Sequence, residues 1–238
     1  MADQEAGRII WRLELDTLRS KRAAALPKDV GNTPGSCRVN KVESSHIGVA
    51  DMRIMGASTP MANLLDGLTI EEHVFTDDGR VPNNPLLPLI VYRGVLETGP
   101  GAAALCETLF AGNGWSGAWR NGVYAHHHYH STAHEVLGIT AGSVRVRLGG
   151  DGGETVELRA GDVVVVPAGV AHKNEGASPD LMVVGAYPGG KSPDMCKPGA
   201  PERERALRNI AEVAPPACDP VYGKPGPLLE RWRVADRG

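Results

Sequence analysis

A cluster of histidines is the part of this sequence best able to do chemistry. Five of the eight histidines of the chain lie between His126 and His134. Side chains alternate between the two faces of a β-strand, so His128 and His130 are expected to point the same way, together with His126. A loop after His130 can return Glu135 to the same interior on the next strand. The pattern therefore predicts imidazoles and a carboxylate that face one space.

A further candidate ligand, His172, follows the turn Pro167-Ala168-Gly169. With it, the set becomes three neutral imidazoles and one carboxylate, which suits one divalent first-row metal ion. Iron, manganese, nickel, zinc and cobalt are all compatible with these ligands. Because only one of these ligands is anionic, a site that holds a divalent ion keeps a net positive charge. Four protein ligands on an octahedral ion leave about two positions for water, substrate or dioxygen.

Short apolar runs predict the elements that must position these side chains. The chain has 30 glycines and 18 prolines, and only 5% of its residues are aromatic. Frequent turn residues between short apolar runs favour an all-β fold of the sandwich or barrel kind. Strands are predicted over residues 69–75, 86–92, 104–110, 122–129, 135–140, 143–148, 155–158, 162–166 and 181–186. The metal pattern occurs once, which predicts one barrel.

Three parts of the chain are expected. Residues 1–68 form an N-terminal extension, partly helical or disordered, in which Pro27 ends a helix that starts near residue 5. Residues 69–200 form the barrel. Residues 201–238 begin with a helix that Pro215 and Pro216 end, and the following tail is expected to pack back on the barrel.

The composition excludes several classes of partner. The formal net charge is -3, which offers no electrostatic reason to bind nucleic acid or an anionic membrane. No run approaches the roughly 18 apolar residues of a membrane-spanning helix. The first ten residues lack the apolar core of a secretory signal. The four cysteines are widely spaced without a CxxC pair, so a reducing cytoplasm is the expected location.

The spacing of the histidine cluster resembles the cupin superfamily. All fixed positions of the first cupin motif are present at their spacing, namely Gly122, His128, His130, Glu135 and Gly142. Most of the second motif is present as Gly161, Pro167, Gly169 and His172. Its final Asn is a departure, because Gly176 stands there and Asn174 lies two residues earlier. The resemblance implies a double-stranded β-helix of the jelly-roll class, with a metal on His128, His130, Glu135 and His172.

A finer resemblance covers about residues 70–228. The phrases that carry it resemble YjlB-type cupins and are Pro82–Pro85, Leu89–Arg93, Tyr129–Gly138, Gly185–Pro188 and Asp219–Gly223. That family implies no particular reaction. A homodimer is expected from the cupin resemblance, because open strand edges need cover.

Several residues near the cluster have two interpretations each. His134 is expected to be a loop or surface residue, or else to orient Glu135. His126 is expected to be structural, or else to line the barrel mouth. Trp119 and Arg120 precede the cluster and form either a flexible lip for an acidic substrate or an ordinary core edge. Cys106 is expected to be a buried, inert thiol in a strand.

Function is left open among three hypotheses. The first is a mononuclear metal-dependent enzyme, oxygenase-like, that acts on a small polar molecule. The second is a metal-dependent isomerase or decarboxylase, which needs a base to shuttle a proton. The third is a small-molecule-binding cupin without turnover. The preference for an oxidoreductase is an analogy with other cupins, and a fold alone does not determine function.

Overall fold

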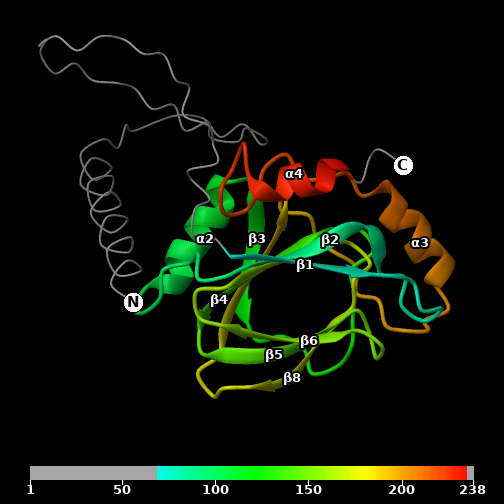
Figure 1. Ribbon diagram of the computed structural model, residues 1–238, viewed down its shortest axis with the longest axis horizontal. Coiled ribbons are helices and arrows are strands. Elements are labelled where there is room, and N and C mark those ends of the chain that lie inside the picture. The colour runs from blue at the N-terminus through cyan, green and yellow to red at the C-terminus, as the bar shows by residue number, and fades with distance from the viewer. Residues whose placement is uncertain (1–68, 235–238) are drawn as a thin grey trace, which may run out of the picture. The chain divides into compact units, whose positions relative to one another are not determined.

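A computed structural model describes residues 69–234, which form a β-sandwich with helices on its outside (Figure 1). The predicted N-terminal extension, residues 1–68, lies outside the described residues. The strands are β1 Ile70–Phe75, β2 Asn84–Tyr92, β3 Trp115–Asn121, β4 Glu135–Ala141, β5 Ser143–Leu148, β6 Glu154–Arg159, β7 Val163–Val166, β8 His172–Ala177 and β9 Met182–Pro188. The helices are α2 Ala102–Gly112, α3 Arg203–Glu212 and α4 Pro227–Val234.

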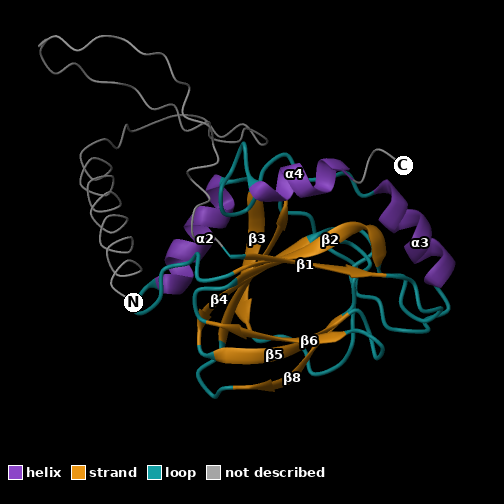
Figure 2. Cartoon of the chain, in the orientation of Figure 1, coloured by secondary structure: helices purple, strands orange, loops and turns teal. Residues whose placement is uncertain are grey.

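The strands form two sheets, as the jelly-roll prediction requires (Figure 2). One sheet has six strands in the order β1-β2-β7-β4-β9-β3, and the other has three in the order β6-β5-β8. The strand pairs of both sheets are antiparallel, and β4 pairs with both β7 and β9. Apart from β1 and β2, neighbouring strands in the large sheet are far apart in the sequence. Long-range pairing of β4 with β7 therefore brings the two cupin motifs together. The predicted all-β fold class is confirmed.

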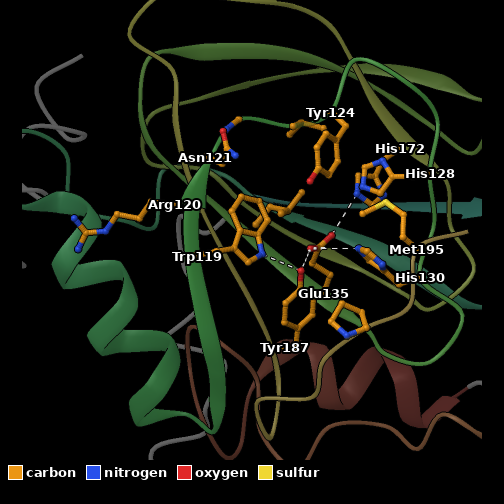
Figure 3. Close-up of a pocket in the computed structure, with 14 residues that line it drawn as sticks. Trp119, Arg120, Asn121, Tyr124, His128, His130, Glu135, His172, Tyr187 and Met195 are labelled. Carbon is orange, nitrogen blue, oxygen red and sulfur yellow. Dashed lines mark hydrogen bonds and ion pairs between the residues drawn. The ribbon is translucent and has the colours of Figure 1, made fainter.

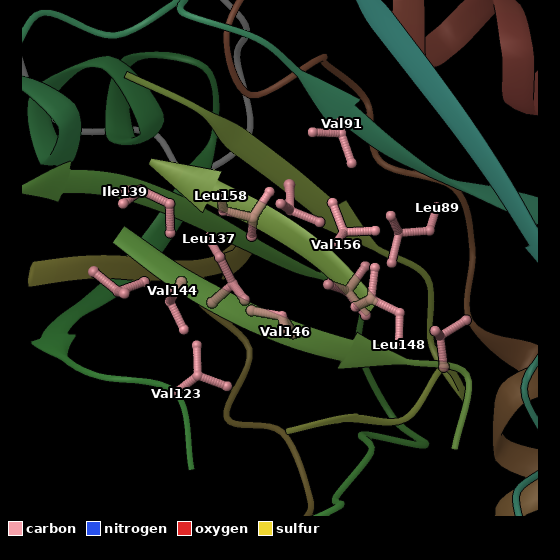
Figure 4. Packing of buried hydrophobic residues seen from close by; sticks show 14 of the residues in the cluster. Leu89, Val91, Val123, Leu137, Ile139, Val144, Val146, Leu148, Val156 and Leu158 are labelled. Carbon is pink, nitrogen blue, oxygen red and sulfur yellow. The ribbon is translucent and has the colours of Figure 1, made fainter. Parts of the chain in front are cut away.

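Alternation along the strands divides the core into two layers. The side chains that fill the space between the two sheets include Leu89, Val91, Leu137, Ile139, Val144, Val146, Leu148, Val156, Leu158 and Val164 (Figure 4). Their strand neighbours Ile90, Tyr92, Val136, Val163 and Val165 face the opposite side and pack with Phe110 of α2 and Trp232 of α4. Helices thus cover the outer face of the large sheet. All four valines of β7 are buried for this reason.

Residues 104–110 form part of helix α2, so the predicted strand is wrong there. The run holds alanine and leucine, which are strong helix formers, and a short apolar run does not by itself separate strand from helix. The helix packs closely on β4, where a Cβ on Gly138 would lie 2.6 Å from the Cys106 sulfur. Cys106 is buried as expected, and burial raises the pKa of its thiol to about 12.

The predicted strand over residues 122–129 is also absent. This stretch is irregular and makes only isolated bridges, between His128 and His172 and between Tyr129 and Cys196. The preceding residues, expected as a lip or a core edge, form strand β3 and pair with β9. The difference matters for the site, because an irregular segment lets histidines two residues apart converge more closely than strand geometry would.

The C-terminal part of the described chain packs on the large sheet. The Trp232 indole N–H donates to the carbonyl of Pro88 at 2.9 Å. The Asp219 carboxylate is fully buried and accepts a hydrogen bond of 2.6 Å from the Tyr92 hydroxyl of β2. The predicted helix is α3. None of the helices within residues 69–234 has the length and apolar character needed to cross a membrane.

Candidate metal site

Three imidazoles converge in the interior of the sandwich (Figure 3). One nitrogen each from His128, His130 and His172 lie within 4.8 Å of one another, and all three side chains are buried. The rings of His128 and His172 are 4.1 Å apart between centroids. Three buried imidazoles gathered this closely are an arrangement that a metal ion can hold.

Backbone pairing places each histidine. His128 and His172 exchange two backbone hydrogen bonds, of 3.2 and 2.9 Å, which fixes the two rings beside each other. The carbonyl of His130 accepts a hydrogen bond of 2.8 Å from the N–H of Gly169. Gly169 has φ 95°, and a Cβ there would lie 2.4 Å from the carbonyl oxygen of Asn83. The motif glycine therefore allows the turn that carries His172 to approach the cluster.

Each ring is oriented by the nitrogen that faces away from the cluster. The Nδ1 atoms of His128 and His172 lie 3.3 Å from the carbonyl oxygens of His126 and Val170, respectively. Nδ1 of His130 makes a short contact with the carbonyl of Asp194. A carbonyl can only accept, so Nδ1 carries a proton, and Nε2 keeps its lone pair in the neutral ring. That is the tautomer a metal ligand needs.

Glu135 completes the cluster from the first position of β4. Its Oε2 lies 3.3 Å from His172 Nε2, and its Oε1 lies 3.6 Å from His130 Nε2. Oε1 also accepts a hydrogen bond of 2.8 Å from the Tyr187 hydroxyl, whereas Oε2 is buried with no hydrogen-bond partner. A buried carboxylate oxygen without a donor is costly unless a cation satisfies it. The predicted ligand set therefore fits a metal ion.

The electrostatics favour the ionised form of Glu135 and the neutral form of His128, which are the forms that bind a metal ion. Burial alone would raise the pKa of Glu135, but the adjacent imidazoles of His130 and His172 outweigh this effect and hold the pKa well below its usual range. Burial lowers the pKa of His128 to about 3, assisted by the neighbouring His172 and His130. The carboxylate is therefore ionised and His128 is neutral across the physiological pH range.

A pocket of about 270 Å³ opens over the cluster. Its lining, besides the three histidines and Glu135, is Trp119, Arg120, Asn121, Gly122, Val123, Tyr124, Leu137, Tyr187, Pro193 and Met195. The pocket is small enough to select compact molecules, and it joins the candidate metal site to a largely apolar wall.

The residues with two interpretations are now placed. His126 is exposed and its ring stacks on Tyr124 at 5.2 Å, and it is not among the residues that line the pocket. His134 lies in the irregular segment before β4, but it is not a surface residue, because its ring is buried against Trp232 of α4. Its Nδ1 accepts a hydrogen bond of 3.0 Å from the N–H of Ala168. The expectation of exposure failed because α4 covers this position.

Two supporting groups were not predicted from the sequence. The Tyr187 hydroxyl that donates to Glu135 accepts a hydrogen bond of 2.8 Å from the indole N–H of Trp119. The Asp194 carboxylate accepts hydrogen bonds from the backbone N–H groups of Ser131, at 2.7 Å, and Thr132, at 3.2 Å. This clamp holds the carbonyl that contacts His130. Tyr187 lies in Gly185–Pro188, one of the phrases that resemble YjlB-type cupins, and this resemblance is the sequence feature that could have pointed to it.

The fold and the site define a class of protein, the cupins. Residues 119–184 match the cupin domain family, a range that contains both motifs and all four predicted ligands. A further comparison narrows the class. Over 163 residues the chain is 46% identical to "Uncharacterized protein YjlB" of Bacillus subtilis (strain 168), which covers 68% of this chain and 96% of that protein. The chain belongs to the YjlB family of cupins.

Solved structures with a similar fold are more distant. A cupin-like protein from Thermotoga maritima is 17% identical with a TM-score of 0.29, covering 57% of this chain and 92% of that one. The epimerase RmlC from Legionella pneumophila is 15% identical with a TM-score of 0.29, covering 50% of this chain and 71% of that one. Likenesses at this level carry no argument about function.

Replacing Tyr187 with phenylalanine is expected to weaken metal binding by about 10- to 100-fold, the usual effect of losing a group that orients a ligand. The phenol is a donor because burial and the adjacent Glu135 raise its pKa. Chelator competition measures the dissociation constant. Tyr124→Phe is the matched control, because Tyr124 also lines the pocket but the tyrosine that donates to Glu135 is Tyr187. Equal affinity of Tyr187→Phe and the native protein would contradict the assignment.

Acid is expected to destabilise the metal-free protein through His134. Burial lowers the pKa of His134 from 6.5 to about 4. Between these pH values His134 is protonated in the unfolded state and neutral in the folded state. The free energy of unfolding therefore falls as the pH drops from about 6.5 to about 4, by on the order of 3 kcal/mol. Denaturant unfolding at a series of pH values measures this slope. His134→Gln should reduce this slope without removing it, because burial also lowers the pKa of His128. An unchanged slope in that variant would refute the explanation.

Proposed function

We propose that this cupin is a mononuclear metal-dependent enzyme, oxygenase-like, that acts on a small polar molecule. The proposed ligands are His128, His130, Glu135 and His172, holding one divalent ion. The observation that carries the proposal is the buried, unpartnered Oε2 of Glu135 facing three imidazoles whose Nδ1 atoms all point to backbone carbonyls.

The bound ion would act as a Lewis acid, and a redox-active ion would also pass electrons from the substrate to dioxygen. The residues of the chain do the rest. The pocket binds and orients the substrate beside the cluster, and its apolar wall limits competing water. Tyr187 keeps its proton and holds Oε1 of Glu135 in place.

The oxygenase-like reading is favoured over proton shuttling by the composition of the pocket. Glu135 is the only carboxylate among the described residues that line it, and that group is committed to the cluster. An isomerase or decarboxylase would need another base near the substrate. That observation supports metal-centred chemistry with a co-reactant.

Oxygen uptake tests the proposal. The full chain is loaded with Fe(II) and presented with a panel of small carboxylates, hydroxy acids and enediols in an oxygen electrode. We expect uptake that requires one class of compound and disappears on chelation and in the His128→Ala/His130→Ala variant. Conversion at the same rate without dioxygen would establish an isomerase or lyase instead. Tight binding with the compound returned unchanged would establish a binding protein.

A further inference from the structure

The charge of the pocket wall indicates which substrates the site can accept. Arg120 is the only lysine or arginine among the described residues that line the pocket. Its Nε donates a hydrogen bond to Oε1 of Glu107 on α2, and its Nη2 donates one to Oε2, both at 2.7 Å. Figure 3 shows the Arg120 side chain extending toward α2 and away from the other labelled residues. This guanidinium is therefore already paired outside the pocket.

The polar groups deeper in the pocket are also committed. The Trp119 indole N–H donates to the Tyr187 hydroxyl, and the Tyr187 hydroxyl donates to Glu135. The remaining wall holds the apolar side chains of Val123, Leu137, Pro193 and Met195. Its other polar side chains, Asn121 and Tyr124, carry no charge. Positive charge for a ligand can thus come only from the histidine cluster and its ion, offset in part by the Glu135 carboxylate. A second negative charge on a ligand would lie beside this wall without a cationic partner.

We infer that the pocket takes compact monoanions, with one anionic oxygen group directed to the three-histidine centre and an apolar body against the wall, and that it discriminates against dianions. This inference rests on the proposed function, because the anionic group needs the bound ion. It replaces the expectation that Arg120 recruits an acidic substrate, since the Glu107 carboxylate occupies that guanidinium.

Three probes of equal chain length test the inference, namely butyrate, succinate and butyramide. The full chain is loaded with Co(II), its metal content is measured, and each probe is titrated at constant ionic strength with calorimetry and the visible spectrum of the ion as readouts. We expect butyrate to bind at least about tenfold more tightly than succinate, the minimum effect of one unpaired buried charge. Butyramide should bind more weakly than butyrate, and metal-free protein should not bind butyrate.

A charge placed in the wall should reduce the discrimination. Met195 lines the pocket and is 50% exposed, so Met195→Lys places an ammonium at the pocket without burying it. The ratio of the succinate to the butyrate dissociation constant should fall by up to about fivefold in this variant, the range of an exposed ion pair. Met182→Lys is the matched control, because Met182 is 37% exposed and does not line the pocket. Its ratio should match the native value.

The outcomes separate the two claims. Succinate or butyramide binding as tightly as butyrate to cobalt-loaded native protein would overturn the inference while leaving the metal site intact. Failure of all three probes to bind the loaded protein would do the same. Failure of the native protein to take up cobalt would overturn the proposed function first, and the inference with it.

Discussion

Replacing His128 and His130 together with alanine is expected to abolish metal binding while the fold is retained. Native protein purified without added metal should carry about one equivalent of a divalent ion, and the variant should carry almost none. Loss of two ligands exceeds the loss of an orienting group, so the fall in affinity should be more than about 100-fold. Elemental analysis of the two proteins side by side measures the difference and identifies the ion.

A matched pair of histidines controls for this experiment. His126 and His127 belong to the same run of residues but lie outside the three-histidine cluster. The backbone carbonyl of His126, which orients His128, survives substitution. His126→Ala/His127→Ala should therefore retain the metal. Absence of metal from native protein even after reloading, or equal metal in native protein and the His128→Ala/His130→Ala variant, would refute the metal site.

Replacing Asp219 with alanine is expected to lower the free energy of unfolding by about 3–5 kcal/mol, the range for breaking a buried charged network. Its Oδ2 accepts hydrogen bonds from the Tyr92 hydroxyl and the N–H of Leu228, at 2.6 and 3.0 Å. Its Oδ1 accepts from the N–H groups of Val221 and Tyr222, at 2.8 and 2.9 Å. The substitution leaves all four donors unpaired, and several of them are buried.

Denaturant unfolding at equal metal content measures this loss. Asp180→Ala is the matched control, because Asp180 is exposed between β8 and β9 and its substitution should change stability by less than about 0.5 kcal/mol. Asp219→Asn should fall between the two, since one amide oxygen replaces two carboxylate oxygens. A loss below about 1 kcal/mol in Asp219→Ala would show that the tail does not depend on this carboxylate.

The sequence by itself determined the candidate ligands and the class of fold. The spacing of His128, His130, Glu135 and His172 is local information, because turn glycines and strand periodicity act over a few residues. The alternation of apolar residues likewise predicted most strands, and the C-terminal helix followed from its apolar face and the prolines behind it. The strand predicted in place of α2 came from a short apolar run, which is compatible with the periodicity of a helix and with that of a strand.

Only the tertiary structure decided which groups support the ligands. Tyr187 lies 52 residues after Glu135, and Asp194 lies 64 residues after His130. His134 is buried because α4 covers it. The Arg120 guanidinium pairs with Glu107 of α2 and not with a ligand in the pocket. Side-chain hydrogen bonds depend on distances and rotamers that packing selects, and packing joins segments remote in sequence. A single sequence therefore specifies what could bind the ion, while the fold decides what holds those ligands in position.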